Sequence, residues 1–310
     1  MRDVLEQAVA LGKTHTHEGA VATYIPELGK VDGSQLGVSV FCQNGKRISV
    51  GDTKVRFSIQ SISKIITLAV ALEICGFDQV FKKVGMEPTG DPFNSLMKLE
   101  NTDSSPYNPM INAGAIVVAS CLASEISFDT MLDTIRALCM DPDINLDKKV
   151  YHSEMSHISR NRAIAYLLES KGYIEKNKDV ENSLHFYVKM CSLSVTAESL
   201  AGLGLILAND GIHPDTGKRL LSSQAVKIVK TLMFTCGMYD GSGEFAVRVG
   251  IPSKSGVGGG ILSVVDGKMG IGIFGPALDK KGNSVAGECV LEYMSHELHL
   301  HMFDPQRHTL

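Results

Sequence analysis

Residues 57–64 read Phe57-Ser58-Ile59-Gln60-Ser61-Ile62-Ser63-Lys64, and an unbroken apolar-rich run over 65–72 follows them. Ser61 and Lys64 stand three residues apart, which places them one turn from each other on the same face of a helix. If the helix begins near Ser61, its first backbone N–H groups have no partner inside the helix and can bind an oxyanion. A lysine at the start of so apolar a helix loses solvation, which lowers its pKa and lets it take a proton from the serine hydroxyl. These are the parts of a serine acyl-transfer site.

The Ser-x-x-Lys spacing occurs a second time, at Ser95-Leu96-Met97-Lys98, so the spacing alone is a weak signal. Taken in isolation, either match is interpreted as a helix N-terminus that carries a solvated lysine. The remainder of the chain has to decide between them.

Composition places the chain among ordinary globular proteins. Its 310 residues, 44% of them apolar and 21% charged, can bury a full core as one large domain or two tightly joined lobes. A net charge of −4 gives no reason to expect nucleic acid or an anionic membrane as a partner. The seven cysteines are scattered without a Cys-x-x-Cys pair, which is typical of buried thiols in a reducing compartment. Because residues 1–6 include acids where a secretory signal needs a basic start, we expect a cytoplasmic protein.

Strand and hairpin signals lie near both ends of the chain. Asn44-Gly45 separates two strand-like runs at 36–42 and 46–50, and Asp266-Gly267 separates 261–265 from 269–274. Helical patterns cover most of the chain between these hairpins and also flank them; the clearest are at 1–12, 113–123, 198–209, 223–233 and 285–298.

These signals predict an α+β fold with one antiparallel sheet built from both termini, helices on both faces of the sheet and an inserted helical lobe. We expect a single catalytic domain over 1–310, in which an α/β lobe spans about 1–75 and 240–310. The helical lobe then spans about 76–239.

Two glycine-rich stretches invite a ligand-binding interpretation. Four glycines in residues 256–260 weaken a strand and usually mark close backbone approach to a ligand or another chain. Residues 270–275 match Gly-x-Gly-x-x-Gly, but Pro276 follows and the preceding turn favours a strand, so a dinucleotide site is rejected. The histidines at 296, 299 and 301 lack the four-residue spacing of a zinc helix, and we expect neither a metal nor a cofactor.

The motifs together resemble a known family. Ser61-x-x-Lys64, followed by Lys254-Ser255-Gly256 near the C-terminus, is similar to the serine β-lactamase and penicillin-binding fold, in which the Lys-Ser/Thr-Gly strand borders the nucleophile helix. A larger set of motifs resembles the serine-dependent glutaminases, and it consists of Tyr24-Ile25-Pro26, residues 57–64, Asp91-Pro92-Phe93-Asn94-Ser95, residues 111–116, residues 161–165, Gly237-Met238-Tyr239 and residues 254–260.

This resemblance implies hydrolysis of L-glutamine to L-glutamate and ammonia, with Ser61 as the nucleophile and Lys64 as its base. Backbone N–H groups of Ser61 and Val257 would form the oxyanion hole. Tyr239 and Tyr24 would lie beside the reacting centre as candidates for proton relay. The resemblance also assigns Ser95 to a different motif, which favours the match at Ser61.

The resemblance further implies that Asn112, Glu154, Asn161 and Tyr187 bind the amino-acid end of the substrate. A free amino acid carries an ammonium, which calls for a carboxylate such as Glu154, and a carboxylate, which Asn and Tyr donors can hold. From the sequence alone, a capping or surface role is the default for the two asparagines and Glu154, and the tyrosines could equally be packing residues. The full set of implied substrate-binding residues is Ser61, Asn112, Glu154, Asn161, Tyr187, Tyr239 and Val257.

Two other functions remain open at this point. One is a penicillin-recognising esterase or β-lactamase on the same fold, for which Ser159-Arg160-Asn161 offers a loose Ser-x-Asn. The other is a protein that binds glutamine without turning it over. The chain lacks the long N-terminal region and ankyrin-type repeats of the larger animal glutaminases, so phosphate activation and filament formation are not carried over. We expect a homo-oligomer, a dimer or a tetramer.

Overall fold

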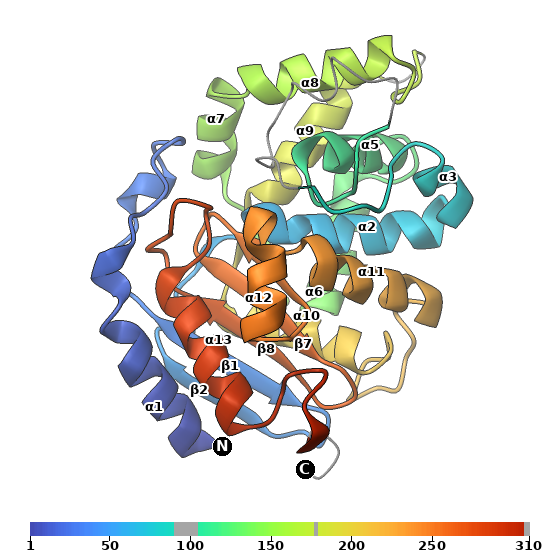
Figure 1. Cartoon of the computed structure of the whole chain (residues 1–310). Helices are drawn as coiled ribbons and strands as arrows, with labels where there is room; N and C mark the ends of the chain where they lie inside the picture. The colour runs from blue at the N-terminus through green and yellow to red at the C-terminus, as the bar shows by residue number, and fades with distance from the viewer. Residues whose placement is uncertain (90–104, 177–178, 307–310) are drawn as a thin grey trace.

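A five-stranded antiparallel sheet forms the lower half of the molecule in Figure 1, which shows the computed structural model. The structure describes residues 1–89, 105–176 and 179–306. The strands lie in the order β2 (Arg47–Gly51), β1 (Gly37–Cys42), β8 (Met269–Phe274), β7 (Gly260–Val265) and β6 (Ser253–Gly256).

The predicted construction of this sheet from both ends of the chain is confirmed. The β1–β2 hairpin turns at Gly45, where φ is 82°, and the β7–β8 hairpin turns at Gly267, where φ is 68°. Glycine adopts these left-handed angles without steric cost, so both tight turns form as the sequence predicts. The two hairpins join where β1 pairs with β8, for example Val40 opposite Ile271.

Helices cover both faces of the sheet, also as predicted. The terminal helices α1 (Arg2–Lys13) and α13 (Val285–Glu297) pack on each other and share one core with the sheet, and α10 (Ala197–Ala208) lies against the opposite face. Gly270 and Gly272 allow this approach, because a Cβ would lie 2.1 Å from Leu205 N at the first position and 2.0 Å from Ala197 O at the second. The Gly-Ile alternation therefore belongs to a strand beneath a closely packed helix.

The segment between the hairpins is mainly helical. Figure 1 shows α2 (Ser63–Ile74) crossing the middle of the molecule, between the sheet and the upper helices. The helix α5 (Asn112–Leu122) is buried on all sides, as expected from its composition. The other helices here are α3 (Phe77–Phe81), α6 (Phe128–Leu138), α7 (Lys148–Ser156), α8 (Ser159–Ser170), α9 (Val180–Cys191), α11 (Ser223–Cys236) and α12 (Ser242–Arg248).

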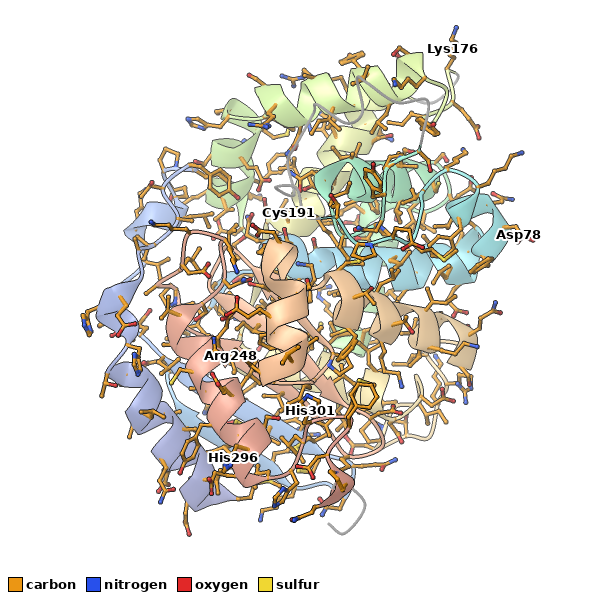
Figure 2. The ribbon with its side chains drawn as sticks, in the orientation of Figure 1. Asp78, Lys176, Cys191, Arg248, His296 and His301 are labelled. Carbon is orange, nitrogen blue, oxygen red and sulfur yellow. The ribbon has the colours of Figure 1, made fainter. Side chains whose placement is uncertain are left out.

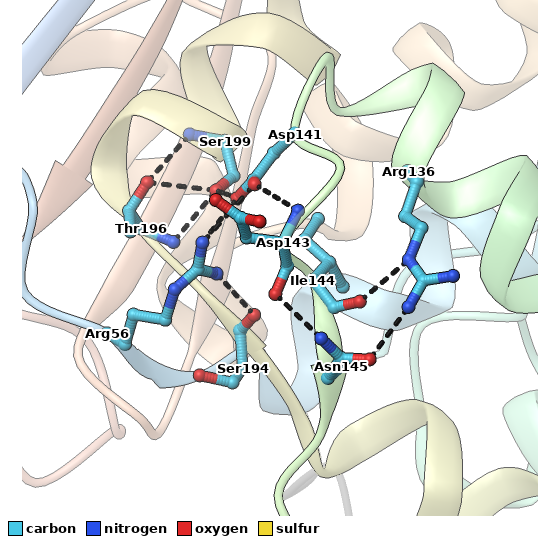
Figure 3. Close-up of polar contacts among 9 residues, drawn as sticks. All are labelled: Arg56, Arg136, Asp141, Asp143, Ile144, Asn145, Ser194, Thr196 and Ser199. Carbon is cyan, nitrogen blue, oxygen red and sulfur yellow. Dashed lines mark hydrogen bonds and ion pairs between the residues drawn. The ribbon is translucent and has the colours of Figure 1, made fainter.

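A second, small sheet was not predicted. It joins β3 (Phe57–Ser58), β5 (Leu193–Val195) and β4 (Asn145–Leu146), and a polar network beside it is drawn in Figure 3. Arg56, directly before β3, donates to Ser194 O at 3.0 Å and contacts both carboxylate oxygens of Asp141 at 3.2 Å. Asp141 also accepts from Ser199 on α10 at 2.5 Å. This network anchors the chain at Arg56, five residues before Ser61.

Two overlapping sequence motifs fall within residues 91–98. Residues 91–98, with the second Ser-x-x-Lys match and the Asp91–Ser95 motif, lie outside the described residues. Across the ranges that are described, no helix is long and apolar enough to cross a membrane.

Candidate active site

Ser61 lies in a single 3₁₀ turn, η3 (Gln60–Ile62), from which α2 continues at Ser63. The predicted helix start near Ser61 is confirmed, with the difference that the first turn is 3₁₀ and not α. Ser61 is only 8% exposed, so it is almost fully buried. The residue before it, Gln60, has a φ of 48°. Such a left-handed angle is costly for a non-glycine residue and persists only where the surroundings hold it.

Lys64 is buried on the same helix. Its Nζ donates to Met110 O at 3.0 Å and to Asn112 Oδ1 at 2.8 Å. Burial lowers the pKa of Lys64 to about 8, and the nearby Cys191 and Glu154 oppose that change. The fall expected from its position before an apolar run is therefore found.

Tyr239 lies next to Ser61 and to the loop that carries Val257. Burial raises the pKa of Tyr239, while interactions of its hydroxyl with the Ser61 side chain and the Val257 backbone act in the opposite direction. Lys254 Nζ lies 4.4 Å from the centroid of the Tyr239 ring, a cation–π geometry when the amine is charged. Burial lowers the pKa of Lys254 well below its usual range, and the neighbouring Lys64 lowers it further.

The glycines after Lys254 bring this loop against the Ser61 segment. A Cβ at Gly256 would lie 2.8 Å from Ile59 O, and one at Gly258 would lie 2.1 Å from Ser58 O. Only glycine permits such contact between two backbones. The close approach expected from the sequence is therefore made to the chain itself, and it brings the Val257 backbone beside Tyr239 and Ser61.

Glu154 on α7 is buried, and Gln60 links it to Tyr24. Gln60 Nε2 donates to Glu154 Oε2 at 3.3 Å, and Tyr24 donates from its hydroxyl to Gln60 Oε1 at 3.0 Å. Burial raises the pKa of Glu154 to about 7, against the effects of the Gln60 hydrogen bond and the Lys64 charge. Tyr24 is 55% exposed as a residue, but its hydroxyl end is covered, and this burial raises its pKa.

Three further candidates lie around this group. Asn112 begins α5 and donates to Asn161 Oδ1 at 3.1 Å, while its own oxygen accepts from Lys64. The cap of α5 is Ile111, so Asn112 does not serve as the N-cap that its position suggests. Tyr187 on α9 is buried beside Cys191 and Glu154, and burial raises its pKa well above the usual value.

Three residues of this site were not singled out from the sequence. Gln60 connects Tyr24 to Glu154, Lys254 lies over Tyr239, and Cys191 accepts a hydrogen bond from Ser63 Oγ at 3.9 Å. Cys191 is labelled in the interior of the molecule in Figure 2, and burial raises its pKa to about 12. Gln60 and Lys254 lie inside motifs quoted from the sequence, and this was the only sign that they belong to the site. No local sequence pattern indicates that Cys191 does.

The arrangement suits acyl transfer at a serine. A buried, weakly basic lysine lies one turn from Ser61, and the phenol of Tyr239 interacts with both the Ser61 side chain and the Val257 backbone. Within the described part of the chain, no group of three or more His, Cys, Asp or Glu side chains is placed to hold a metal ion.

Known proteins are similar to this sequence over nearly its full length. A family model described as Glutaminase matches residues 19–303. A glutaminase of Fusobacterium nucleatum is 51% identical over 98% of this chain and 100% of its own length. A protein called glutaminase 2 from Clostridium perfringens is 47% identical over the same shares.

Solved structures agree in fold. A probable glutaminase, YbaS, superposes with a TM-score of 0.90 at 39% identity and covers 98% of this chain and 99% of its own. The Bacillus subtilis glutaminase YbgJ, in a covalent complex with 5-oxo-L-norleucine, superposes with a TM-score of 0.86 at 37% identity and covers 96% of this chain and 98% of its own. The chain described above therefore belongs to the glutaminase family.

Proposed function

We propose that this chain hydrolyses the side-chain amide of L-glutamine to L-glutamate and ammonia through an acyl-enzyme on Ser61. The observation that carries the proposal is a buried Lys64, with a pKa of about 8, one helical turn from Ser61. Family membership supports the overall reaction, and the assignment of each residue below rests on its chemistry and surroundings.

Lys64 is proposed as the base that activates Ser61. A neutral amine has two N–H groups, which can serve Met110 O and Asn112 Oδ1, and it keeps a lone pair for the Ser61 proton. Ser61 Oγ then attacks the carboxamide carbon, and the negative charge that develops on the amide oxygen is held by the N–H groups of Ser61 and Val257.

Tyr239 is proposed to relay to the leaving nitrogen the proton that Lys64 took from Ser61, so that Lys64 is neutral and Tyr239 is protonated again when ammonia leaves. Its hydroxyl interacts with the Ser61 side chain and with the Val257 backbone, so it lies beside the side chain that the proposal acylates. Loss of ammonia leaves an ester between Ser61 and the glutamyl group. A water molecule, deprotonated by the same base, cleaves that ester and restores the hydroxyl. Tyr24 is a second relay candidate through its bond to Gln60.

The remaining polar residues are proposed to bind the amino-acid end. Glu154 offers a carboxylate to the substrate ammonium, and the ammonium would in turn favour the ionised form of Glu154. Asn112, Asn161 and Tyr187 offer amide and hydroxyl donors to the substrate carboxylate. Asn161 is connected to Lys64 through Asn112, which would couple recognition of that end to the base.

We also propose that the protein acts in the cytoplasm as a homo-oligomer. Burial of Cys42, Cys121, Cys139, Cys191 and Cys236 is in keeping with a reducing compartment. Light scattering of the purified protein tests the second part, and a mass equal to one chain at micromolar concentration would contradict it.

An ammonia-release assay tests the proposed reaction. Wild-type protein should release ammonia from glutamine faster than from asparagine, and it should not open a β-lactam. Ser61→Ala should lose activity by at least about 10³-fold, whereas the matched change Ser95→Ala, at the other Ser-x-x-Lys, should retain it. Substantial turnover by Ser61→Ala would refute the nucleophile assignment. Glutamine binding without turnover in the wild type would favour a silent binding protein.

A further inference from the structure

Tyr239 is held in a backbone conformation that it would not adopt unaided. Its φ is 54°, in the left-handed region that side chains with a Cβ avoid. Residues in such conformations persist only when their surroundings fix them, and they cluster at functional sites. The question is therefore which groups fix Tyr239.

The hydroxyl of Ser242 bridges the backbone on both sides of Tyr239. Ser242 Oγ donates to Tyr239 O at 2.8 Å and accepts from Met238 N at 3.0 Å. Ser242 is buried at the start of α12, so water does not readily replace these bonds. One side chain thus closes the turn around the strained residue.

The amide of Asn283 holds the same turn from the other side. Asn283 Nδ2 donates to Met238 O at 3.3 Å, and the residue is only 1% exposed. Asn283 is fixed in turn by Asp279, whose carboxylate accepts from Asn283 N at 2.8 Å and from Lys281 N at 2.9 Å. A buried carboxamide whose own backbone is anchored is a rigid support for its acceptor.

The turn that presents Asn283 also contacts the ring of Tyr239 and the loop of Val257. Gly282 has a φ of 94°, and a Cβ there would lie 3.5 Å from Tyr239 Cε2 and 3.3 Å from Val257 Cγ1. The segment 279–283 therefore lies against both Tyr239 and the loop that carries Val257.

We propose that Ser242 and Asn283 form a clamp that positions the Tyr239 hydroxyl at Ser61, and that their contribution to the reaction passes through that hydroxyl. The inference rests on the proposed function, because it assigns Tyr239 a proton-transfer role. Both bond the backbone around Tyr239, and the proposal assigns them as positioning residues. Loss of the clamp should misplace the phenol without removing the nucleophile, the base or the ammonium-binding carboxylate.

A double-mutant cycle tests the clamp, with kcat and KM for glutamine and the Tm measured for every variant. Ser242→Ala should lower kcat on the order of tenfold, because proton transfer of this kind contributes about 10²–10⁴-fold when well placed. KM should change by less than about twofold. In a Tyr239→Phe background, Ser242→Ala should lower kcat no further, since the hydroxyl through which it acts is absent.

Asn283→Asp provides a second arm, because a carboxylate of the same shape presents only acceptors to Met238 O. It should lower kcat at least as much as Ser242→Ala, and it should likewise have no effect beside Tyr239→Phe. Ser39→Ala is the matched control: it removes a buried serine hydroxyl that bonds Ser49 Oγ at 2.9 Å between β1 and β2, at the edge of the sheet opposite β6. Its kcat should equal that of the wild type whatever its Tm.

If Ser242→Ala lowers kcat by the same factor in the wild type and in the Tyr239→Phe background, the clamp is overturned. Unchanged kcat in Ser242→Ala would overturn it as well. If Asn283→Asp does not fold, the Ser242→Ala cycle alone decides. Ser61→Ala is measured alongside to separate the clamp from the proposed function. If Ser61→Ala is inactive and Tyr239→Phe is slow while Ser242→Ala is fully active, the clamp is rejected and the proposed function stands.

Discussion

Lys64 and Glu154 are buried ionisable residues, and burial moves the pKa of each toward neutral pH. The shift of Lys64 could be predicted, because its place at the start of an apolar helix is visible in the sequence. The burial of Glu154 could not, because α7 is a mainly polar helix on which only Val150 and Glu154 are buried. Only the tertiary packing of Gln60 and Tyr24 around its carboxylate makes it part of the site.

These two groups predict the pH dependence of the reaction. Lys64 must be neutral to accept a proton, so activity should rise as pH rises through about 8. Glu154 must be ionised to hold an ammonium, so binding should strengthen as pH rises through about 7. A plot of log(kcat/KM) against pH should therefore have a slope of about two below both values, about one between them, and level off above them.

Lys64→Arg supplies the control for this profile. Its guanidinium stays protonated and cannot act as a base, so activity should be lost at every pH at which the protein folds. A kcat/KM that falls as pH rises from 6 to 8 would contradict the assignment of both groups. Near-normal activity of the Arg variant would contradict the role of Lys64.

Helices and hairpins were predictable wherever the pattern was long or the turn had a distinctive sequence. Asn44-Gly45 and Asp266-Gly267 mark both hairpins, because tight hairpin turns need a residue with positive φ and Gly45 and Gly267 supply it. The strands β3 and β4 have two residues each, so no alternation of side chains could reveal them. The strand β6 ends where the glycine-rich stretch begins, and its contact with η3 follows from tertiary packing that no local pattern encodes.

The approach of the β6–β7 loop to the Ser61 segment can be tested at one glycine. Gly258→Ala places a Cβ where Ser58 O lies 2.1 Å away, so the loop and the Val257 N–H must shift. Displacing one oxyanion-hole donor lowers kcat by about 10²–10³-fold. Overpacking of this kind also costs about 1–3 kcal/mol of stability. Steady-state kinetics and chemical denaturation measure the two effects separately.

Gly33→Ala is the matched control for that substitution. A Cβ at Gly33 would meet Val21 Cγ1 at 3.5 Å, an ordinary contact, so activity and stability should stay close to those of the wild type. If Gly258→Ala kept full kcat, Val257 could not be donating from the position described.

The assembly of one sheet from both termini was predicted correctly, and it follows from two hairpins at opposite ends of a helical segment. We propose that the chain forms one catalytic domain over 1–310. Three parts of the site support this: Ser61 comes from η3, Glu154 from the inserted helices and Val257 from the loop after β6. The way these parts meet could not be derived from the residues, because it depends on close contacts between backbone segments that are far apart in the sequence. Only the family resemblance indicated that they form one site.

If the chain is one domain, thermal unfolding should follow a single transition. The Tm of that transition should depend on the protonation of Glu288. Burial and the nearby Asp279 raise the pKa of Glu288 to about 7, above the usual carboxyl value of 4.5. Between these two values the folded state binds more protons than the unfolded state, so stability falls as pH rises and levels off above about 7. Glu288→Gln should therefore be more stable than the wild type at pH 8, by about 1–2 kcal/mol after partial exposure is discounted.

Calorimetry of the wild type and the variant at pH 5 and pH 8 measures both claims. Glu6→Gln, which removes an exposed carboxylate 3.7 Å from Arg2, should leave the Tm nearly unchanged. A variant advantage at pH 5 that vanishes at pH 8 would contradict the sign. Two well-separated transitions would contradict a single domain.

The central claim is that Ser61 carries the acyl group, and peptide mapping after treatment with 6-diazo-5-oxo-L-norleucine tests it most directly. This compound reacted covalently with the Bacillus subtilis relative. Trypsin cuts after Arg56 and Lys64, so Ser61 falls in a peptide that contains no cysteine. The account predicts one label per chain in that peptide, located by fragmentation at Ser61 and absent from Ser61→Ala. A label on Ser58, on Ser63 or on any of the seven cysteines would contradict it.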